Sequence, residues 1–216
     1  TAIFKEKCYS FSHVVSSSKV CFDTQEAGVE AVVAEGCEHG RNNGREETPT
    51  FAWMPKLTEQ ISIPLIAAGG IATGRGMLAA MVLGADGVQV GSRFAASKES
   101  SSHNNFKRTI VEVKEGDTQV TLKELAPVRM IKNKFYQDVQ ALYAKCPTPE
   151  ELKTLLGRAR AKKGMFEGDL IEGELEIGQI AGIIHDIKPA AQIIKDMMAE
   201  FEIAKKEVLN LNGEIA

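Results

Sequence analysis

Pro64–Phe94 reads PLIAAGGIATGRGMLAAMVLGADGVQVGSRF, and this stretch decides the fold. It opens with the apolar run Pro64–Ala68, which has no polar alternation and is typical of a strand covered on both faces. A helical pattern follows over Met77–Leu83, and a second short strand pattern follows over Gly87–Val90. Two strands joined by one helix predict a parallel βαβ unit.

Glycine stops both strands at their carboxyl ends, first at Gly69-Gly70 and then at Gly91-Ser92. At such turns the backbone N–H groups can approach an anion closely, and a following helix N-terminus adds partial positive charge. The Ser92 hydroxyl can also donate to a phosphate oxygen. We therefore expect a phosphate site between these turns, as after the last two strands of a (β/α)8 barrel. The alternative is that the glycines serve only turns that need positive φ.

Strand and helix patterns alternate along the first part of the chain, with strands expected to begin at Tyr9, Ala31, Pro64 and Gly87. This alternation predicts an α/β fold with a parallel sheet. Four strands are half of a (β/α)8 barrel and leave two unpaired edges. We therefore expect residues 1–97 to form a TIM-barrel-derived unit containing only the last four strands.

The pattern changes after this unit, and residues 98–216 are expected to form a helical region. Helices are predicted over Asn105–Val113, Leu122–Lys145, Leu175–His185 and Pro189–Val208, with a loop over Gly164–Gly173. A further helix should start at Thr148, because Thr148, Pro149 and Glu151 form a capping-box pattern. Residues 174–216 are expected to pack back on the barrel unit.

Composition excludes several classes of function. The 216 residues are 44% hydrophobic and 25% charged, with a formal net charge of −3, which argues against a nucleic-acid surface. The best apolar run is interrupted by glycine and arginine, so no membrane span is expected. The four cysteines lack metal-ligand spacing and are typical of reduced cytoplasmic thiols, so no metal is expected. The chain does not begin with Met, so residues preceding Thr1 remain an open question.

Four motifs carry a resemblance to a known family: AVVAEG, AAGGIATGRG, GADGVQVGSRF and EIGQIAG. Together they resemble the nitronate monooxygenases, a family that includes the flavin-dependent enoyl-ACP reductases. The resemblance implies FMN as cofactor. It implies cofactor-binding roles for residues at three strand ends, namely Glu35, Gly36, Gly40, Gly69, Gly70, Gln89, Val90, Gly91 and Ser92. For Gly178 in EIGQIAG, close packing of a helix is an equally good interpretation.

The segment Glu35–Gly44 departs from the family pattern. The family usually reads Glu-Gly-x-Glu-Ala-Gly-Gly-His-x-Gly, whereas this chain reads EGCEHGRNNG. The active-site histidine falls on Asn42, which cannot accept or release a proton near neutral pH. His39 could substitute for it, although the alternative is a solvent-exposed loop histidine. A side chain at Arg41 is also expected to restrict a backbone that glycine leaves free.

The resemblance implies an FMN-dependent enzyme that oxidises alkyl nitronates with oxygen. One alternative is reduction of an enoyl thioester through the flavin. Another is a catalytically impaired or incomplete flavin-binding remnant, which the replacement at Asn42 and the half-barrel pattern favour. A small-molecule substrate is expected in the first two cases. The sequence leaves the exact substrate, the electron donor and a homodimeric state open.

Overall fold

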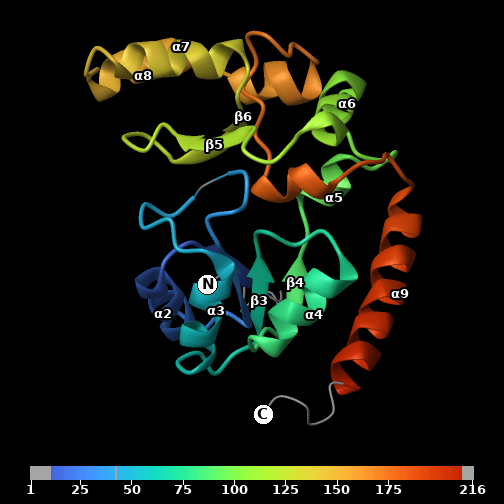
Figure 1. Cartoon of the computed structure of the whole chain (residues 1–216). Helices are drawn as coiled ribbons and strands as arrows, with labels where there is room; N and C mark the ends of the chain where they lie inside the picture. The colour runs from blue at the N-terminus through green and yellow to red at the C-terminus, as the bar shows by residue number, and fades with distance from the viewer. Residues whose placement is uncertain (1–10, 42, 211–216) are drawn as a thin grey trace, which may run out of the picture.

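The computed structural model describes residues 11–41 and 43–210. Tyr9, the expected start of the first strand, and Asn42 lie outside the described residues. Figure 1 shows the parallel sheet with its helices in one part of the molecule. Another part holds the hairpin of β5 (Thr118–Thr121) and β6 (Val128–Ile131) with the helices α7 (Lys134–Tyr143) and α8 (Pro149–Leu156). The long helix α9 (Ala190–Leu209) runs alongside α4 (Gly74–Val82).

The sheet is four-stranded and parallel, with the order β1-β2-β3-β4, as the βαβ pattern predicts. The strands are β1 Ser12–Val15, β2 Ala31–Glu35, β3 Leu65–Ala68 and β4 Gly87–Gln89. Glu35 pairs with Ala68, and Ala68 pairs with Gln89. This register brings the carboxyl ends of β2, β3 and β4 level with one another, so the loops that follow them share one edge.

The connecting helices are α2 Ser18–Glu26, α3 Thr50–Thr58 and α4 Gly74–Val82. Ser17 caps α2 and Thr73 caps α4, each by accepting a bond from a backbone N–H in the first turn. Apolar side chains of the sheet and helices form one core, in which Val32, Met54, Leu57 and Ala67 are fully buried. Burial of this apolar surface is what fixes the strand ends in place.

The predicted helix over Leu122–Lys145 is wrong in its first half. The structure has a two-stranded antiparallel hairpin there, β5 Thr118–Thr121 and β6 Val128–Ile131, followed by α7 Lys134–Tyr143. Pro127 disfavours a helical conformation at the residue before it, and Asn133 caps a new helix by accepting from Tyr136 N. The helical spacing belongs to α7 alone.

The predicted helix over Leu175–His185 is also wrong. Residues 175–177 are extended and pair with β6, since Ile131 N donates to the carbonyl of Leu175 and Ile177 N donates to the carbonyl of Arg129. Only the 3₁₀ turn η2, Gln179–Ile183, is helical. Glycine weakens a helix because it has the most backbone freedom to lose, and it recurs in this segment.

The remaining helices follow the four strands of the parallel sheet. They are α5 Ser92–Ala95, α6 Asn104–Glu112 and α8 Pro149–Leu156, with a short π-helix η1 at Lys162–Phe166. The capping box predicted for α8 is confirmed, with both of its hydrogen bonds present. Neither α5 nor η1 was expected, because each is too short to show a periodic pattern.

Helix α9, Ala190–Leu209, lies against α4. Gly74 N donates to Glu200 Oε2 over 2.9 Å, and Arg75 forms an exposed ion pair with Glu207. A second apolar cluster combines Ala72 and Ala96 with residues of α6 and of the 175–184 segment. Apolar packing therefore continues from the sheet unit into the second half of the chain.

Candidate active site

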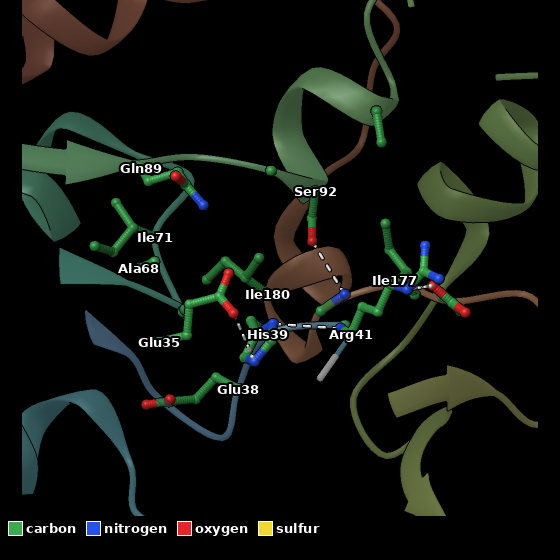
Figure 2. Close-up of a pocket in the computed structure, with 17 residues that line it drawn as sticks. Glu35, Glu38, His39, Arg41, Ala68, Ile71, Gln89, Ser92, Ile177 and Ile180 are labelled. Atoms are coloured by element: carbon green, nitrogen blue, oxygen red, sulfur yellow. Dashed lines mark hydrogen bonds and ion pairs between the residues drawn. The ribbon is translucent and has the colours of Figure 1, made fainter. Parts of the chain in front are cut away.

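A cavity of about 280 Å³ opens where the carboxyl ends of β2, β3 and β4 meet (Figure 2). Its wall combines the three loops after these strands with α5 and the segment that begins at residue 176. The lining residues are Glu35, Glu38, His39, Gly40, Arg41, Ala68, Gly69, Gly70, Ile71, Gln89, Gly91, Ser92, Ala95, Glu176, Ile177, Gly178 and Ile180. Most of the site residues expected from the sequence therefore come together in one place.

The glycine turn after β3 needs glycine for its conformation. Gly69 has φ +98° and Gly70 has φ +70°, a region that residues with a Cβ rarely adopt. The Thr50 hydroxyl lies within hydrogen-bond distance of the carbonyls of Ala68 and Gly69, at 3.3 and 3.2 Å. The start of α3 thus holds this turn at the cavity edge.

The turn after β4 is open. Gly91 has an ordinary φ of −101°, and a Cβ built there would meet nothing within 4 Å. The fold itself therefore does not require glycine at this position, and the missing side chain leaves room in the cavity. Next to it, the Ser92 hydroxyl accepts a hydrogen bond from Gly178 N over 3.0 Å (Figure 2). That bond uses a lone pair and leaves the O–H free to donate.

Two expected cofactor residues lie outside the cavity wall. A Cβ at Gly36 would meet the Thr50 hydroxyl at 2.1 Å, so glycine here allows α3 to approach the sheet. Val90 packs against the apolar core of the sheet. By contrast, Gly40 lines the wall, and a Cβ there would lie 3.1 Å from the backbone of Ile177.

Glu35 and His39 face one another inside the cavity (Figure 2). His39 Nε2 lies 3.3 Å from Glu35 Oε2, and the two side chains are only 12% and 15% exposed. His39 is therefore not the exposed loop histidine of the alternative interpretation. Burial raises the pKa of the Glu35 carboxyl to about 7, so this carboxyl can hold or release a proton near neutral pH.

The backbone fixes the tautomer of His39. Arg41 N donates to His39 Nδ1 over 3.3 Å, so Nδ1 is an acceptor and a neutral imidazole carries its proton on Nε2. That proton faces the carboxyl of Glu35. Arg41 itself is not among the non-glycine residues with positive φ, so its backbone is not strained and the expected conflict with glycine does not arise.

Glu38 holds the same loop from its other side. Its carboxylate accepts from Thr50 N at 3.0 and 3.1 Å and lies 3.0 Å from the Thr50 hydroxyl. A negative charge at the first turn of α3 is favourable, because unpaired N–H groups and the helix dipole point there. No role for Glu38 is expected from the sequence, although it is an acidic residue between two glycines of the loop.

A second cavity, of about 170 Å³, adjoins the first. Arg41 and Glu176 line both cavities, and Arg41 Nε lies 3.7 Å from Glu176 Oε2. Burial raises the pKa of Glu176 despite the arginine, and burial together with Glu176 raises the pKa of Glu174 to about 7. Neither glutamate was singled out from the sequence, because only the pairing of residues 175–177 with β6 brings them here.

Residues 11–41 and 43–210 contain no group of three or more His, Cys, Asp or Glu that could hold a metal ion. Within the same residues, no helix is long and apolar enough to cross a membrane.

Comparison with known proteins identifies the family. The nitronate monooxygenase family model matches residues 4–200. A protein of Staphylococcus saprophyticus described as a probable nitronate monooxygenase is 36% identical over 176 residues, which cover 74% of this chain and 49% of that protein. A probable nitronate monooxygenase of Staphylococcus aureus is 36% identical over 152 residues, which cover 65% of this chain and 43% of that protein. The chain thus spans about half the length of these curated relatives.

Two solved structures share the fold. FabK from Thermotoga maritima is 38% identical with a TM-score of 0.90, and the alignment covers 96% of this chain and 65% of FabK. Nitroalkane oxidase from Streptomyces ansochromogenes is 24% identical with a TM-score of 0.78, and the alignment covers 96% of this chain and 61% of the oxidase chain. The fold is thus that of a known family of enzymes. This chain belongs to the nitronate monooxygenase family.

Proposed function

We propose that the protein containing this chain is an FMN-dependent oxidoreductase that oxidises alkyl nitronates with oxygen. Family membership supports the class of reaction. The observation that supports a cofactor site is the open space at Gly91. The cavity wall there has room for a group that the chain does not supply. When bound, FMN would supply the redox chemistry, and the protein residues orient the partners and handle the proton.

The FMN phosphate is assigned to the space between Gly69-Gly70 and Gly91-Ser92. Backbone N–H groups at these turns suit an anion, since glycine lets the backbone come close. The Ser92 hydroxyl accepts from Gly178 N and can therefore direct its own proton toward a phosphate oxygen. Gln89, the last residue of β4, lies two positions before Gly91 and lines the same wall.

Glu35 and His39 are proposed to handle the proton at this site. A nitronate is already an anion and needs no deprotonation, whereas a neutral nitroalkane must first lose a proton from carbon. The family position for this task falls on Asn42, which carries no titratable proton. Glu35 has a pKa of about 7 and faces the cavity, and His39 orients it from 3.3 Å. Glu35 is thus the base that a neutral substrate would meet.

The chain is proposed to supply only part of a barrel. β1 and β4 are the outer strands of the four-stranded sheet, and the match to the curated relative from Staphylococcus saprophyticus covers only 49% of that protein. In this proposal, residues 1–97 form the half-barrel unit, and residues 98–216 form a mainly helical region that contains the β5–β6 hairpin. Residues 174–216 return to the sheet unit. The remaining strands would come from sequence that these residues do not include.

Purification and reconstitution with FMN test the proposal. The full chain should retain FMN, and stopped-flow absorbance should show turnover of ethyl nitronate faster than turnover of nitroethane. Retention of FMN without turnover of either substrate would favour the impaired remnant. Failure of FMN to bind even in excess would refute the cofactor site.

A second candidate is reduction of an enoyl thioester, which the resemblance to the family also implies. The apolar wall of the second cavity favours it, since an acyl chain needs such a surface. Crotonyl thioester consumption by the FMN-loaded chain with dithionite as the electron source distinguishes the two reactions. Reduction of crotonyl thioester without oxidation of ethyl nitronate would select this alternative.

A further inference from the structure

The second cavity lies directly behind the ion pair that closes one side of the main cavity. We propose that it is a subsite for the uncharged alkyl chain of the substrate, an inference that rests on the proposed function of the main site. Arg41 and Glu176 belong to both walls, so a molecule reaching from one cavity into the other passes this pair. The two cavities form one elongated site.

The wall beyond the ion pair is apolar except for Glu174. It is built by the loop before β6 and by the end of α8, and its apolar residues are Leu122, Leu125, Ala126, Pro127, Val128 and Leu156. Leu122 and Val128 are buried, at 1% and 5% exposure. Such a surface gains free energy from contact with methylene groups and offers a polar tail few partners.

The ion pair is weak enough to move aside. The Arg41 side chain is 70% exposed and reaches Glu176 through a single contact of 3.7 Å. The Glu176 side chain is only 9% exposed, but burial raises its pKa and favours the neutral carboxyl, so the exposed arginine can move into water without leaving a buried charge behind. The arginine backbone stays in place because the segment is bound to the hairpin, where Arg129 N donates to the carbonyl of Gly40 over 2.7 Å and Asn43 N donates to the carbonyl of Pro127.

The two glutamates set the charge that the subsite accepts. Both carboxyls are buried, and burial favours their neutral forms, so the wall can lie against an alkyl chain without an exposed negative charge. A carboxylate at the end of the substrate chain would lose its hydration against the apolar wall, and the two acidic groups offer it no cationic partner. The subsite therefore selects an uncharged tail.

The size of the cavity limits the chain length. A volume of about 170 Å³ corresponds to roughly five or six groups of the size of a water molecule, at about 30 Å³ each. Binding should strengthen as methylenes are added until this space is full. Longer chains should gain nothing more.

Isothermal titration of neutral 1-nitroalkanes, from nitroethane to 1-nitrooctane, into the FMN-reconstituted chain under anaerobic conditions tests the subsite. Affinity should rise about fourfold for each methylene, as burial of one methylene predicts, and level off near 1-nitrohexane. 6-Nitrohexanoate should bind no better than nitroethane. Equal affinity for all chain lengths, or equally tight binding of 6-nitrohexanoate and 1-nitrohexane, would overturn the proposal.

The test variant is Ala126→Phe, which fills the second cavity from an exposed position. Its control is Ala141→Phe, which adds the same side chain to the exposed face of α7. Ala126→Phe should weaken binding of 1-nitrohexane on the order of 10²-fold and leave nitroethane unchanged, since four methylenes lose their contacts. Ala141→Phe should behave like the unmodified chain. A chain-length dependence that persists in Ala126→Phe, or disappears in both variants, contradicts the subsite.

The titration is independent of turnover. If the chain turns over neither nitronate nor enoyl thioester but retains the chain-length dependence, the proposed reaction fails and the subsite stands. If turnover is found without the dependence, the subsite fails and the reaction stands.

Discussion

Two regions lie at the same edge of the sheet: the glycine turns after β3 and β4, and the loop after β2. Different interactions hold these two regions in place. The turn at Gly69-Gly70 is determined by its own backbone, with positive φ at two successive glycines. The loop over residues 35–43 is held by groups from far along the chain, including Arg129, whose N–H bonds to Gly40, and Gln179, whose N–H bonds to Glu38.

The contents of the two regions differ as well. At the turn after β4 no protein atom lies within 4 Å of a Cβ added to Gly91, whereas the loop lines its part of the cavity with charged and titratable side chains such as Glu35, His39 and Arg41. An open turn made of backbone donors suits the binding of a group from outside. A loop with its own carboxyl and imidazole suits chemistry on that group. The comparison predicts that substitutions will separate binding from reaction.

The largest effect is expected for Glu35→Gln, which removes the carboxyl from the loop and leaves the turns intact. Turnover of a neutral nitroalkane should fall about 10²–10⁴-fold, the usual worth of a positioned acid or base, while turnover of the nitronate falls much less. Steady-state oxygen consumption with nitroethane and ethyl nitronate measures both. Equal losses for the two substrates would show that Glu35 does not carry the proton.

Adding Asn42→His to Glu35→Gln makes this test sharper. A histidine at the family position should restore turnover of the neutral nitroalkane and introduce a pH dependence near the ordinary pKa of histidine, about 6.5. No accompanying Arg41→Gly change is needed, because Arg41 has no positive φ to relieve.

Gly91→Val addresses the open turn. A branched side chain would fill the space assigned to the phosphate, and the loss of hydrogen bonds to a charged group, at about 1.5–3 kcal/mol each, should weaken FMN binding on the order of 10²-fold. Gly87→Val is the matched control, since Gly87 also has no atom within 4 Å of an added Cβ but lies outside the cavity wall. Flavin stoichiometry after gel filtration is the measurement. Retention equal to the control would remove the phosphate from this turn.

The pH dependence of stability reports on the buried carboxyls. Glu35 and Glu174 have pKa values of about 7 in the fold, above the ordinary 4.5, so the folded chain keeps protons that the unfolded chain has lost. The free energy of unfolding should therefore fall as the pH rises from about 4.5 to 7, by up to about 1.4 kcal/mol per pH unit for each group. His39 faces Glu35, and Arg41, Arg160 and Glu176 face Glu174.

Urea denaturation at pH 5 and pH 7.5 checks this expectation. The double variant Glu35→Gln and Glu174→Gln should lose most of the difference between the two conditions. A difference that persists unchanged in the double variant would mean that other groups cause it.

The smallest effect is expected at Thr148, far along the chain from both regions of the comparison. Thr148→Ala removes the side-chain cap of α8 and should lower the free energy of unfolding by about 1 kcal/mol. FMN retention should stay the same. A change of flavin affinity without a change of stability would place α8 at the cofactor. FMN binding would then depend on a helix outside both regions of the comparison.

Local chemistry made the turns predictable. Glycine at a strand end, repeated at Gly69-Gly70 and Gly91, is visible in a single sequence, because the reason for it lies within a few residues. The capping box of α8 is predictable for the same reason. The parallel order of the four strands followed from the alternation of apolar strands and helices.

The rest depends on contacts that sequence spacing does not contain. The strand β6 was mistaken for helix because the apolar spacing of Phe135 and Val139 in α7 extends by coincidence to Val128 and Ile131. Glu176 reaches the cavity only through pairing with β6. The position of His39, buried rather than exposed, follows from a loop that β6 and the segment near Gly178 enclose together.

The single hydrogen bond between Gly178 N and the Ser92 hydroxyl joins residues that are 86 positions apart. A ligand that draws the Ser92 proton toward itself strengthens the oxygen as an acceptor, and therefore strengthens this bond. By thermodynamic reciprocity, tighter docking of residues 174–188 must then favour the ligand by the same factor. The amide of Gly178 should exchange its hydrogen more slowly when the cavity is filled, so it reports occupancy from the opposite wall.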